Sequence, residues 1–218
     1  MQALSHAFLL VYAGLFPIVN PVGSAPFFLR LTRRVSASKR HALSGRVALD
    51  SFVLLLASLF IGSHVLDFFG ITLPIVRIGG GLVVAALGWK MLNDEESDDR
   101  RGEKLAQEAP AEPDAFYPLT MPLTVGPGSI SVAITLGSQR PQLPSMTDLA
   151  FVGGGAVAGI VAITATVYVC YRFADRIVNW LGTSGTNVLM RLSAFILLCI
   201  GIQIAWSGIA VLTGLPEP

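Results

Sequence analysis

Charged residues are scarce in this chain. It holds 15 Lys and Arg and 14 Asp and Glu among 218 residues, so that 13% of the residues are charged and 53% are hydrophobic. Soluble globular domains carry about 25% charged residues, and the mean hydropathy of this chain is +0.66. These values exclude an ordinary soluble domain and predict an integral membrane protein.

Reactive side chains are equally few. The two cysteines, Cys170 and Cys199, lack the spacing of a metal site or a disulfide framework. The three histidines are scattered and suggest neither a metal cluster nor a Ser-His-Asp arrangement. The glycine runs at 79–81 and 153–155 lack the spacing of a phosphate-binding loop and favour close helix packing. We therefore expect no enzyme activity, no metal and no cofactor.

Long apolar stretches dominate the sequence. About 20 apolar residues in a helix cross a hydrocarbon core of roughly 30 Å. Six stretches approach or exceed this length, at residues 7–29, 47–69, 73–92, 117–137, 149–171 and 192–212. The first residues lack the basic segment of a cleavable signal peptide, so we expect the N-terminus to be retained. The sequence predicts an all-α integral membrane protein with six transmembrane helices.

Lys and Arg residues concentrate in every second loop. The three basic loops, which follow the first, third and fifth stretches, contain Arg30, Arg33, Arg34, Lys39, Arg40, Arg46, Lys90, Arg100, Arg101, Lys104, Arg172 and Arg176. The positive-inside rule places these loops in the cytoplasm, which puts both termini in the periplasm of a bacterial inner membrane. Membrane topology explains the basic loops without nucleic acid as a partner.

A charged segment divides the chain into two halves. Residues 93–116, which include "NDEESDDRRGEKLAQEAP", mix acidic and basic residues with Pro and Ala, as is typical of a solvated linker. The expected units are a first three-helix repeat at 1–92, this cytoplasmic linker at 93–116, and a second three-helix repeat at 117–218.

The two halves share short motifs. "PIVNPVGS" and "PLTVGPGS" both follow the pattern P-x5-G-S, 105 residues apart. "RIGGGL", which starts at Arg77, and "RLSAFI", which starts at Arg191, form a second match. Because each half has three spans, the second half enters the membrane from the opposite side. This arrangement is typical of an inverted-topology repeat.

Each P-x5-G-S motif places Pro and Gly near the middle of its span. Proline removes a backbone donor and clashes with the preceding turn, so we expect residues 20–24 and 126–129 to unwind. A new half-helix then begins after each break, capped by Ser24 or Ser129, with Pro26 in the first turn of one of them. Two helix N-termini that face one cavity would bind a carboxylate. The alternative is a pair of simple kinks.

These segments resemble the signature of a known family. "NPVGSAPFF", "MPLTVGPGSI", "RIGGG" and "RLSA" are similar to segments of the MarC family of bacterial inner-membrane proteins, over residues 9–212. The resemblance implies a six-helix protein of the LysE-like transporter group. For SnatA-type members it implies transport of glycine, alanine and similar neutral amino acids. The substrate-binding residues that it implies are Asn20, Pro21, Gly23, Ser24, Thr124, Gly126, Pro127, Gly128 and Ser129.

The polar groups at the breaks suit a zwitterionic amino acid. Half-helix N–H groups and the hydroxyls of Ser24 and Ser129 would bind its carboxylate. The side-chain oxygen of Asn20, the hydroxyl of Thr124 and unwound carbonyls would accept hydrogen bonds from its ammonium group. The spans have no acidic residue near their middle, which argues against a dedicated exporter of cations or polyamines.

Five ionisable residues at the span ends are candidates for gating or coupling: Asp50, Asp67, Arg77, Asp148 and Arg191. Charge inside a membrane is a functional hypothesis by default, although side chains near span ends also snorkel to water. Arg77 with Asp67 or Asp148 would form an outer gate, and Arg191 with Asp50 an inner gate. A coupling proton would use Asp50, whereas a coupling Na+ would use unwound carbonyls.

The sequence therefore predicts a secondary transporter of small neutral amino acids that works by alternating access. A passive channel for small polar solutes and a membrane interaction or scaffold protein are the alternatives. The expected partners are an amino acid and the lipid bilayer. A homo-oligomer through the glycine-rich faces, the direction of transport and the coupling ion stay open.

Overall fold

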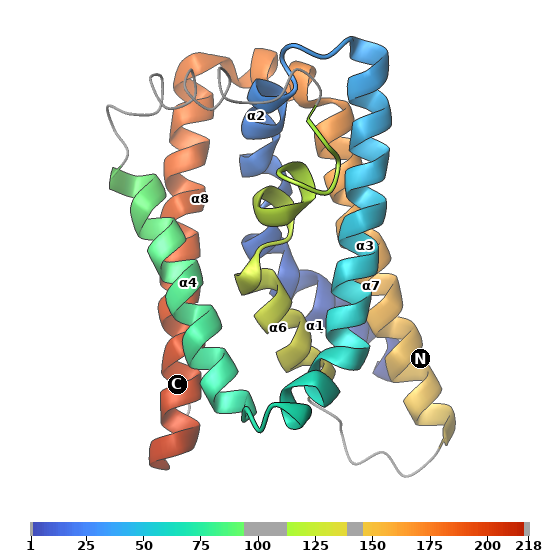
Figure 1. Ribbon diagram of the computed structural model, residues 1–218, viewed down its shortest axis with the longest axis vertical. Helices are drawn as coiled ribbons and strands as arrows, with labels where there is room; N and C mark the ends of the chain where they lie inside the picture. The colour runs from blue at the N-terminus through green and yellow to red at the C-terminus, as the bar shows by residue number, and fades with distance from the viewer. Residues whose placement is uncertain (1, 94–112, 139–145, 216–218) are drawn as a thin grey trace.

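The computed structural model describes residues 2–93, 113–138 and 146–215 (Figure 1). Within these ranges the regular structure is helical, as expected, and an isolated bridge between Asp114 and Pro118 is the only extended pairing. The helices are α1 (Gln2–Val19), α2 (Pro21–Leu31), α3 (Ala37–Phe68), α4 (Leu73–Asn93), the π-helix η1 (Leu119–Thr124), α6 (Pro127–Ser138), α7 (Met146–Arg172) and α8 (Ala174–Thr213).

Four of these helices contain segments long and apolar enough to cross a membrane: Ala37–Phe68, Leu73–Lys90, Ala150–Arg172 and Arg191–Thr213. A fifth candidate is the bent pair formed by α1 and α2, whose axes differ by 42°. The predicted span at 117–137 instead consists of η1 followed by α6, an apolar helix of 12 residues. The described residues thus form an all-helical membrane protein with four to five candidate spans.

Glycine residues bring α4 and α8 into close antiparallel contact. A Cβ on Gly81 would collide with the backbone of Gly201 and Ala205, and one on Gly88 would lie 2.7 Å from the carbonyl oxygen of Ala194. Gly208 likewise approaches the carbonyl oxygen of Pro74 on the opposite helix. Small residues allow such close backbone approach between membrane helices. The expectation that the run at 79–81 serves helix packing is confirmed for Gly81 and also for Gly80, which lies against Ser131 of α6.

A similar contact joins α1 to α7. Gly155 lies against the carbonyl oxygen of Leu4, and a Cβ on Gly159, one turn later, would lie 3.0 Å from the carbonyl oxygen of Phe8. The hydroxyls of Tyr12 and Thr166 also approach to 3.3 Å. This packing holds the first part of the bent pair against α7 and thereby fixes the position of the break that follows.

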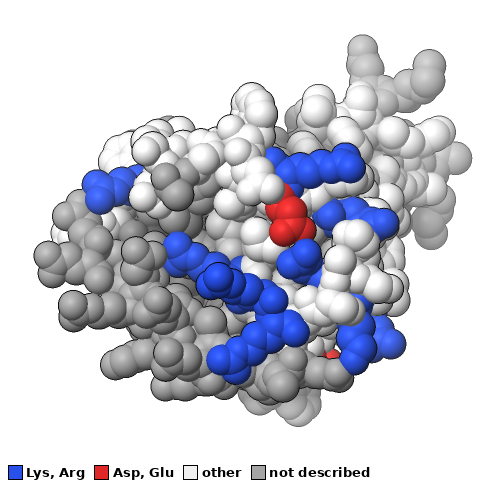
Figure 2. Space-filling view, turned by 90° about the horizontal axis from the view of Figure 1, so that it is seen from above, with Lys and Arg blue, Asp and Glu red and all other residues white. Residues whose placement is uncertain are grey.

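Basic side chains gather at one end of the molecule. Figure 2 shows Lys and Arg side chains across the face where α2 ends and α3 begins. An ion pair of 2.9 Å between Arg40 on α3 and Asp175 on α8 joins two of the predicted basic loops at this end. Both termini lie at the opposite end (Figure 1). The predicted separation of the termini from these basic loops is therefore confirmed.

Candidate functional site

The first break is a single residue, Asn20, between α1 and α2. Its backbone is left-handed, with φ 45° and ψ 58°, a conformation that Asn tolerates better than most residues other than Gly. Its side-chain oxygen accepts a hydrogen bond from the N–H of Gly23 at 3.2 Å, which is the geometry of an N-cap. Pro21 occupies the first position of α2, where proline is favoured.

The second break is longer and more irregular. It comprises η1, in which Met121 has non-helical angles (φ −113°, ψ 121°), and the extended residue Val125. The helix α6 then begins at Pro127, and its first regular hydrogen bond is donated by the N–H of Ile130 to the carbonyl of Gly126. The N–H groups of Gly128 and Ser129 precede this bond and are directed out of the helix end.

Three details of the sequence prediction were wrong. Residues 21–24 and 127–129 are helical, so the breaks lie just before them rather than across them. Asn20, not Ser24, caps α2. The hydroxyls of Ser24 and Ser129 instead donate to the carbonyls of Asn20 and Gly126, both at 2.9 Å, because these serines lie inside the first turn of each helix.

The third error concerns proline, because Pro26 was expected in the first turn of its half-helix. Pro26 lies inside α2, and Pro21 and Pro127 occupy the first position of the two half-helices. Proline at that position loses no hydrogen bond, because the first N–H groups of a helix lack an intrahelical partner. Each half-helix therefore begins at the second proline of its motif.

The two half-helices begin near the same level and run in opposite directions. From the middle of the molecule, α2 runs toward the basic end and α6 toward the end that holds the termini (Figure 1). A Cβ on Gly128 would lie 3.8 Å from Cγ2 of Ile18, in the last turn before the first break. The start of α6 thus packs on the last turn before the first break, and both half-helices have their positive dipole end toward the middle of the molecule.

Tyr171 on α7 connects the second break to α2, and no sequence pattern predicted this contact. Its hydroxyl lies 2.8 Å from Oγ1 of Thr124, within hydrogen-bond distance. Its ring stacks on Phe28 of α2, with ring centroids 4.3 Å apart and an angle of 14° between the planes. With 1% of its surface exposed, Tyr171 is among the largest fully buried side chains of the described residues. One aromatic residue therefore contacts the hydroxyl of Thr124 at the second break and the ring of Phe28 on α2.

Most of the predicted site residues lie inside the protein. The buried ones are Pro21, Gly23, Ser24, Thr124, Gly128 and Ser129, whereas Asn20 and Gly126 are partly buried and Pro127 is exposed. The structure therefore brings both motifs to one central region, as the sequence predicted. Their role in binding a substrate stays a prediction.

Four of the five gating candidates have side chains that the structure describes. Arg77 lies in the first turns of α4, next to Gly208 of α8, and is partly buried. Asp67 is exposed near the end of α3, Asp50 is partly buried on the same helix, and Arg191 is exposed on α8. The side chain of Asp148 is outside the described residues. The proposed gate pairs stay predictions.

Substitution of Asn20 should separate the contribution of its side chain from that of its backbone angle. We expect Asn20→Ala to lose about 1 kcal/mol of capping energy and about 1–2 kcal/mol more because alanine is strained at positive φ. Asn20→Gly removes the side chain without that strain, so its loss should be a few tenths of a kcal/mol. Thermal unfolding of the two purified variants measures the difference. Equal losses would contradict the left-handed conformation.

Comparison with known proteins agrees that the chain is an integral membrane protein. The sequence profile described as "MarC family integral membrane protein" matches residues 5–213. The UPF0056 inner membrane protein MarC of Escherichia coli (strain K12 / DH10B) is 31% identical over 201 residues, which cover 89% of this chain and 90% of the relative. The corresponding protein of Salmonella typhimurium (strain LT2) is 29% identical over the same coverage. No solved structure matches the chain. The chain belongs to the MarC family of integral membrane proteins.

Proposed function

We propose that this protein is a secondary transporter of small neutral amino acids, which it binds between its two broken helices. The observation that carries the proposal is that α2 and α6 both begin near the middle of the molecule and run in opposite directions, with the start of α6 packed on the last turn of α1 before the first break. Irregular backbone at membrane depth is tolerated where it lines a cavity or is buried in protein. Discontinuous helices at matching places in two halves are typical of transporter binding sites.

Helix pairing supports a 3+3 inverted repeat. The half-helix α2 packs on α7 and α8 of the second half, and its counterpart α6 packs on α3 and α4 of the first half. Two further pairs, α3 with α7 and α4 with α8, join equivalent helices of the two halves, and the packing of α1 on α7 has its counterpart in that of η1 on α3. Exchange of the halves therefore relates most of the larger helix contacts to one another, which favours an inverted repeat.

The available groups match the two charges of an amino acid. The N–H groups of Gly128 and Ser129, at the positive end of α6, are donors for a carboxylate. The side-chain oxygen of Asn20 and the carbonyls of the second break are acceptors for an ammonium group. Neither set places a formal charge in the membrane, which suits a substrate that is neutral overall.

Close packing around Gly128 favours a small substrate. A Cβ on this residue would collide with Val84 of α4, which leaves little room beside the α6 N-terminus. Glycine and alanine add the least volume beyond the charged groups. Coupling to H+ or Na+ and alternating access are part of the same proposal.

The protein is a multi-pass inner-membrane protein. Its relatives in Escherichia coli and Salmonella typhimurium are named inner membrane proteins, and it holds several helices apolar enough to span a bilayer. A transporter in this location would exchange amino acids between the cytoplasm and the periplasm.

Ligand-dependent thermal stability of the purified protein tests the proposed substrate class. A ligand that binds the folded state alone stabilises it by about 2.7 kcal/mol at 100 times its Kd. We expect stabilisation by glycine and alanine, and little or none by phenylalanine, lysine or acetate. If no small neutral amino acid stabilises a well-folded sample, the substrate class is wrong.

A matched pair of serine variants locates the binding site in the same assay. Ser129 and Ser207 both donate a hydroxyl hydrogen bond to the carbonyl three residues earlier, at 2.9 and 2.8 Å. Ser129→Ala should reduce the stabilisation by alanine, whereas Ser207→Ala, in α8, should retain it. Equal effects of the two variants would contradict a site at the α6 N-terminus.

A further inference from the structure

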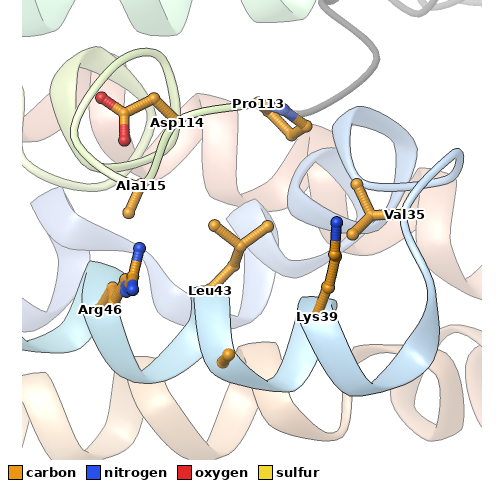
Figure 3. A pocket seen from close by; sticks show the side chains of 8 residues that line it. Val35, Lys39, Leu43, Arg46, Pro113, Asp114 and Ala115 are labelled. Carbon is orange, nitrogen blue, oxygen red and sulfur yellow. The ribbon is translucent and has the colours of Figure 1, made fainter.

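A cavity of about 430 Å³ lies at the basic end of the molecule, away from the helix breaks. It is formed by the α2–α3 connection, the first turns of α3 and the segment 113–115 that leads to η1 (Figure 3). Its volume falls within the range of ligand-binding pockets, about 300–1,000 Å³. The cavity is lined by Val35, Lys39, Ala42, Leu43, Arg46, Pro113, Asp114 and Ala115.

The lining combines two cations with an apolar wall. Lys39 and Arg46 lie seven residues apart on α3, about two helical turns, and therefore share one face of the helix. Leu43 lies between them on that face, and Pro113 and Ala115 form the opposite side (Figure 3). Asp114 is the only carboxylate of the lining and lies at the other end of the cavity from Lys39 (Figure 3). The cavity has a net charge of +1 from its side chains.

The depth of the cavity in the membrane is set by α3. The apolar stretch of this helix begins at about residue 47, and the cavity residues 39–46 come just before it. They lie at the end where basic side chains gather (Figure 2). Lipid phosphates occupy this level of a membrane, and basic pockets between helices at the cytoplasmic surface bind anionic headgroups.

We propose that this cavity binds the phosphate group of an anionic phospholipid, with Lys39 and Arg46 as its ligands. Arg supplies a fork of donors for phosphate oxygens, and Lys supplies a point charge. Leu43, Pro113 and Ala115 contact the less polar part of the ligand. A headgroup with a net negative charge complements the net positive charge of the cavity, whereas a zwitterionic headgroup does not.

A bound phosphate would also connect α3 to the second break. The carbonyl of Ala115 accepts hydrogen bonds from both the N–H and the hydroxyl of Thr120, at 2.9 and 2.8 Å. The wall of the cavity is thereby fixed to the first residues of η1. Occupancy of the cavity should therefore stabilise the fold, whether or not the protein transports amino acids.

Native mass spectrometry of the purified full-length protein tests the proposal. The protein is titrated with phosphatidylglycerol or phosphatidylcholine, and the Lys39→Gln/Arg46→Gln variant is compared with Arg33→Gln/Arg34→Gln. The control removes two exposed cations from the same end that do not line the cavity. We expect wild type to retain phosphatidylglycerol preferentially and the cavity variant to lose about tenfold or more in affinity. The control should change much less. Circular dichroism confirms that both variants are folded.

A competition arm identifies the source of the phosphate. If millimolar inorganic phosphate displaces phosphatidylglycerol from the wild type, the cavity recognises the phosphate itself and also takes it from solution. Failure of phosphate to displace the lipid would show that the lipid is the required source. Equal losses in the two double variants, or no preference of wild type for phosphatidylglycerol, would overturn the proposal.

Discussion

A Gly128→Leu variant should lose more than about 99% of amino acid uptake while it remains folded. Any side chain at this position meets Val84 of α4, and Ile18 lies just beyond. Excess volume in a packed interior costs about 1–3 kcal/mol of stability. We expect the variant to relieve this collision by displacing the N-terminus of α6. Because a misplacement of 1 Å at a reacting site costs about a hundredfold in rate, we expect binding at this helix end to suffer similarly.

Gly79→Leu is the matched control for this variant. Gly79 lies on α4, and a Cβ at this position would meet no atom within 4 Å. The same substitution there adds an apolar side chain without a collision, so uptake should stay near that of the wild type. Equal loss of uptake in both variants would show that a leucine in this part of the bundle is harmful regardless of the break.

Tyr171→Phe should reduce uptake about tenfold with a small effect on stability. The substitution removes the hydroxyl that contacts Thr124 at 2.8 Å but retains the ring that stacks on Phe28. Loss of one neutral hydrogen bond costs about 0.5–1.5 kcal/mol of stability. Thr124 keeps its bond to the carbonyl of Leu119, at 2.8 Å, but is no longer held against α7. The maximal rate and the KM of alanine uptake into proteoliposomes measure the effect.

Tyr168→Phe provides the comparison, because Tyr168 lies on the same helix and 40% of its surface is exposed. It should retain uptake and thermal stability. A double-mutant cycle with Thr124→Val then measures whether the two hydroxyls act together, since contacting residues typically couple by about 0.5–3 kcal/mol. Additive effects of the two substitutions on uptake would contradict a shared role at the breaks.

The location of the two helix breaks was predictable from the sequence because proline and glycine act locally. Pro21 and Pro127 end one helical segment and begin the next by removing a backbone donor. The shared motif also identified the regions of the chain that meet in the centre. The details of capping were not predictable, because Asn, Ser and Pro each stabilise the start of a helix at different positions. The left-handed conformation of Asn20 decides among them.

The role of Tyr171 was not predictable from the sequence. A tyrosine near the end of an apolar stretch is typical of a membrane interface, where its hydroxyl reaches water. Its hydroxyl instead contacts Thr124, 47 residues earlier in the chain, a relation that no local pattern encodes. The shortness of α6 was also missed, because Pro118 and Pro122 lie within an apolar stretch that hydropathy alone extends to the full width of the membrane.

Glycine runs show the same limit of local patterns. Their composition predicted close packing, but the structure distributes it unevenly. Gly81 contacts backbone atoms of α8, and Gly155 contacts backbone atoms of α1. A Cβ on Gly79, Gly153 or Gly154, in contrast, would meet no atom of another helix within 4 Å. Which glycine of a run faces a neighbouring helix depends on the rotation of its own helix, and tertiary packing determines that rotation.

Accumulation of labelled glycine and alanine in proteoliposomes is the most direct measurement of the transporter proposal. Purified wild type and Gly128→Leu are reconstituted, and either a proton or a sodium gradient is imposed. We expect the wild type to accumulate both amino acids above the external concentration with one of the two gradients, and Gly128→Leu to accumulate neither. Flux that only equilibrates the two sides would identify a channel. No flux from folded wild-type protein under either gradient would contradict transport of these amino acids.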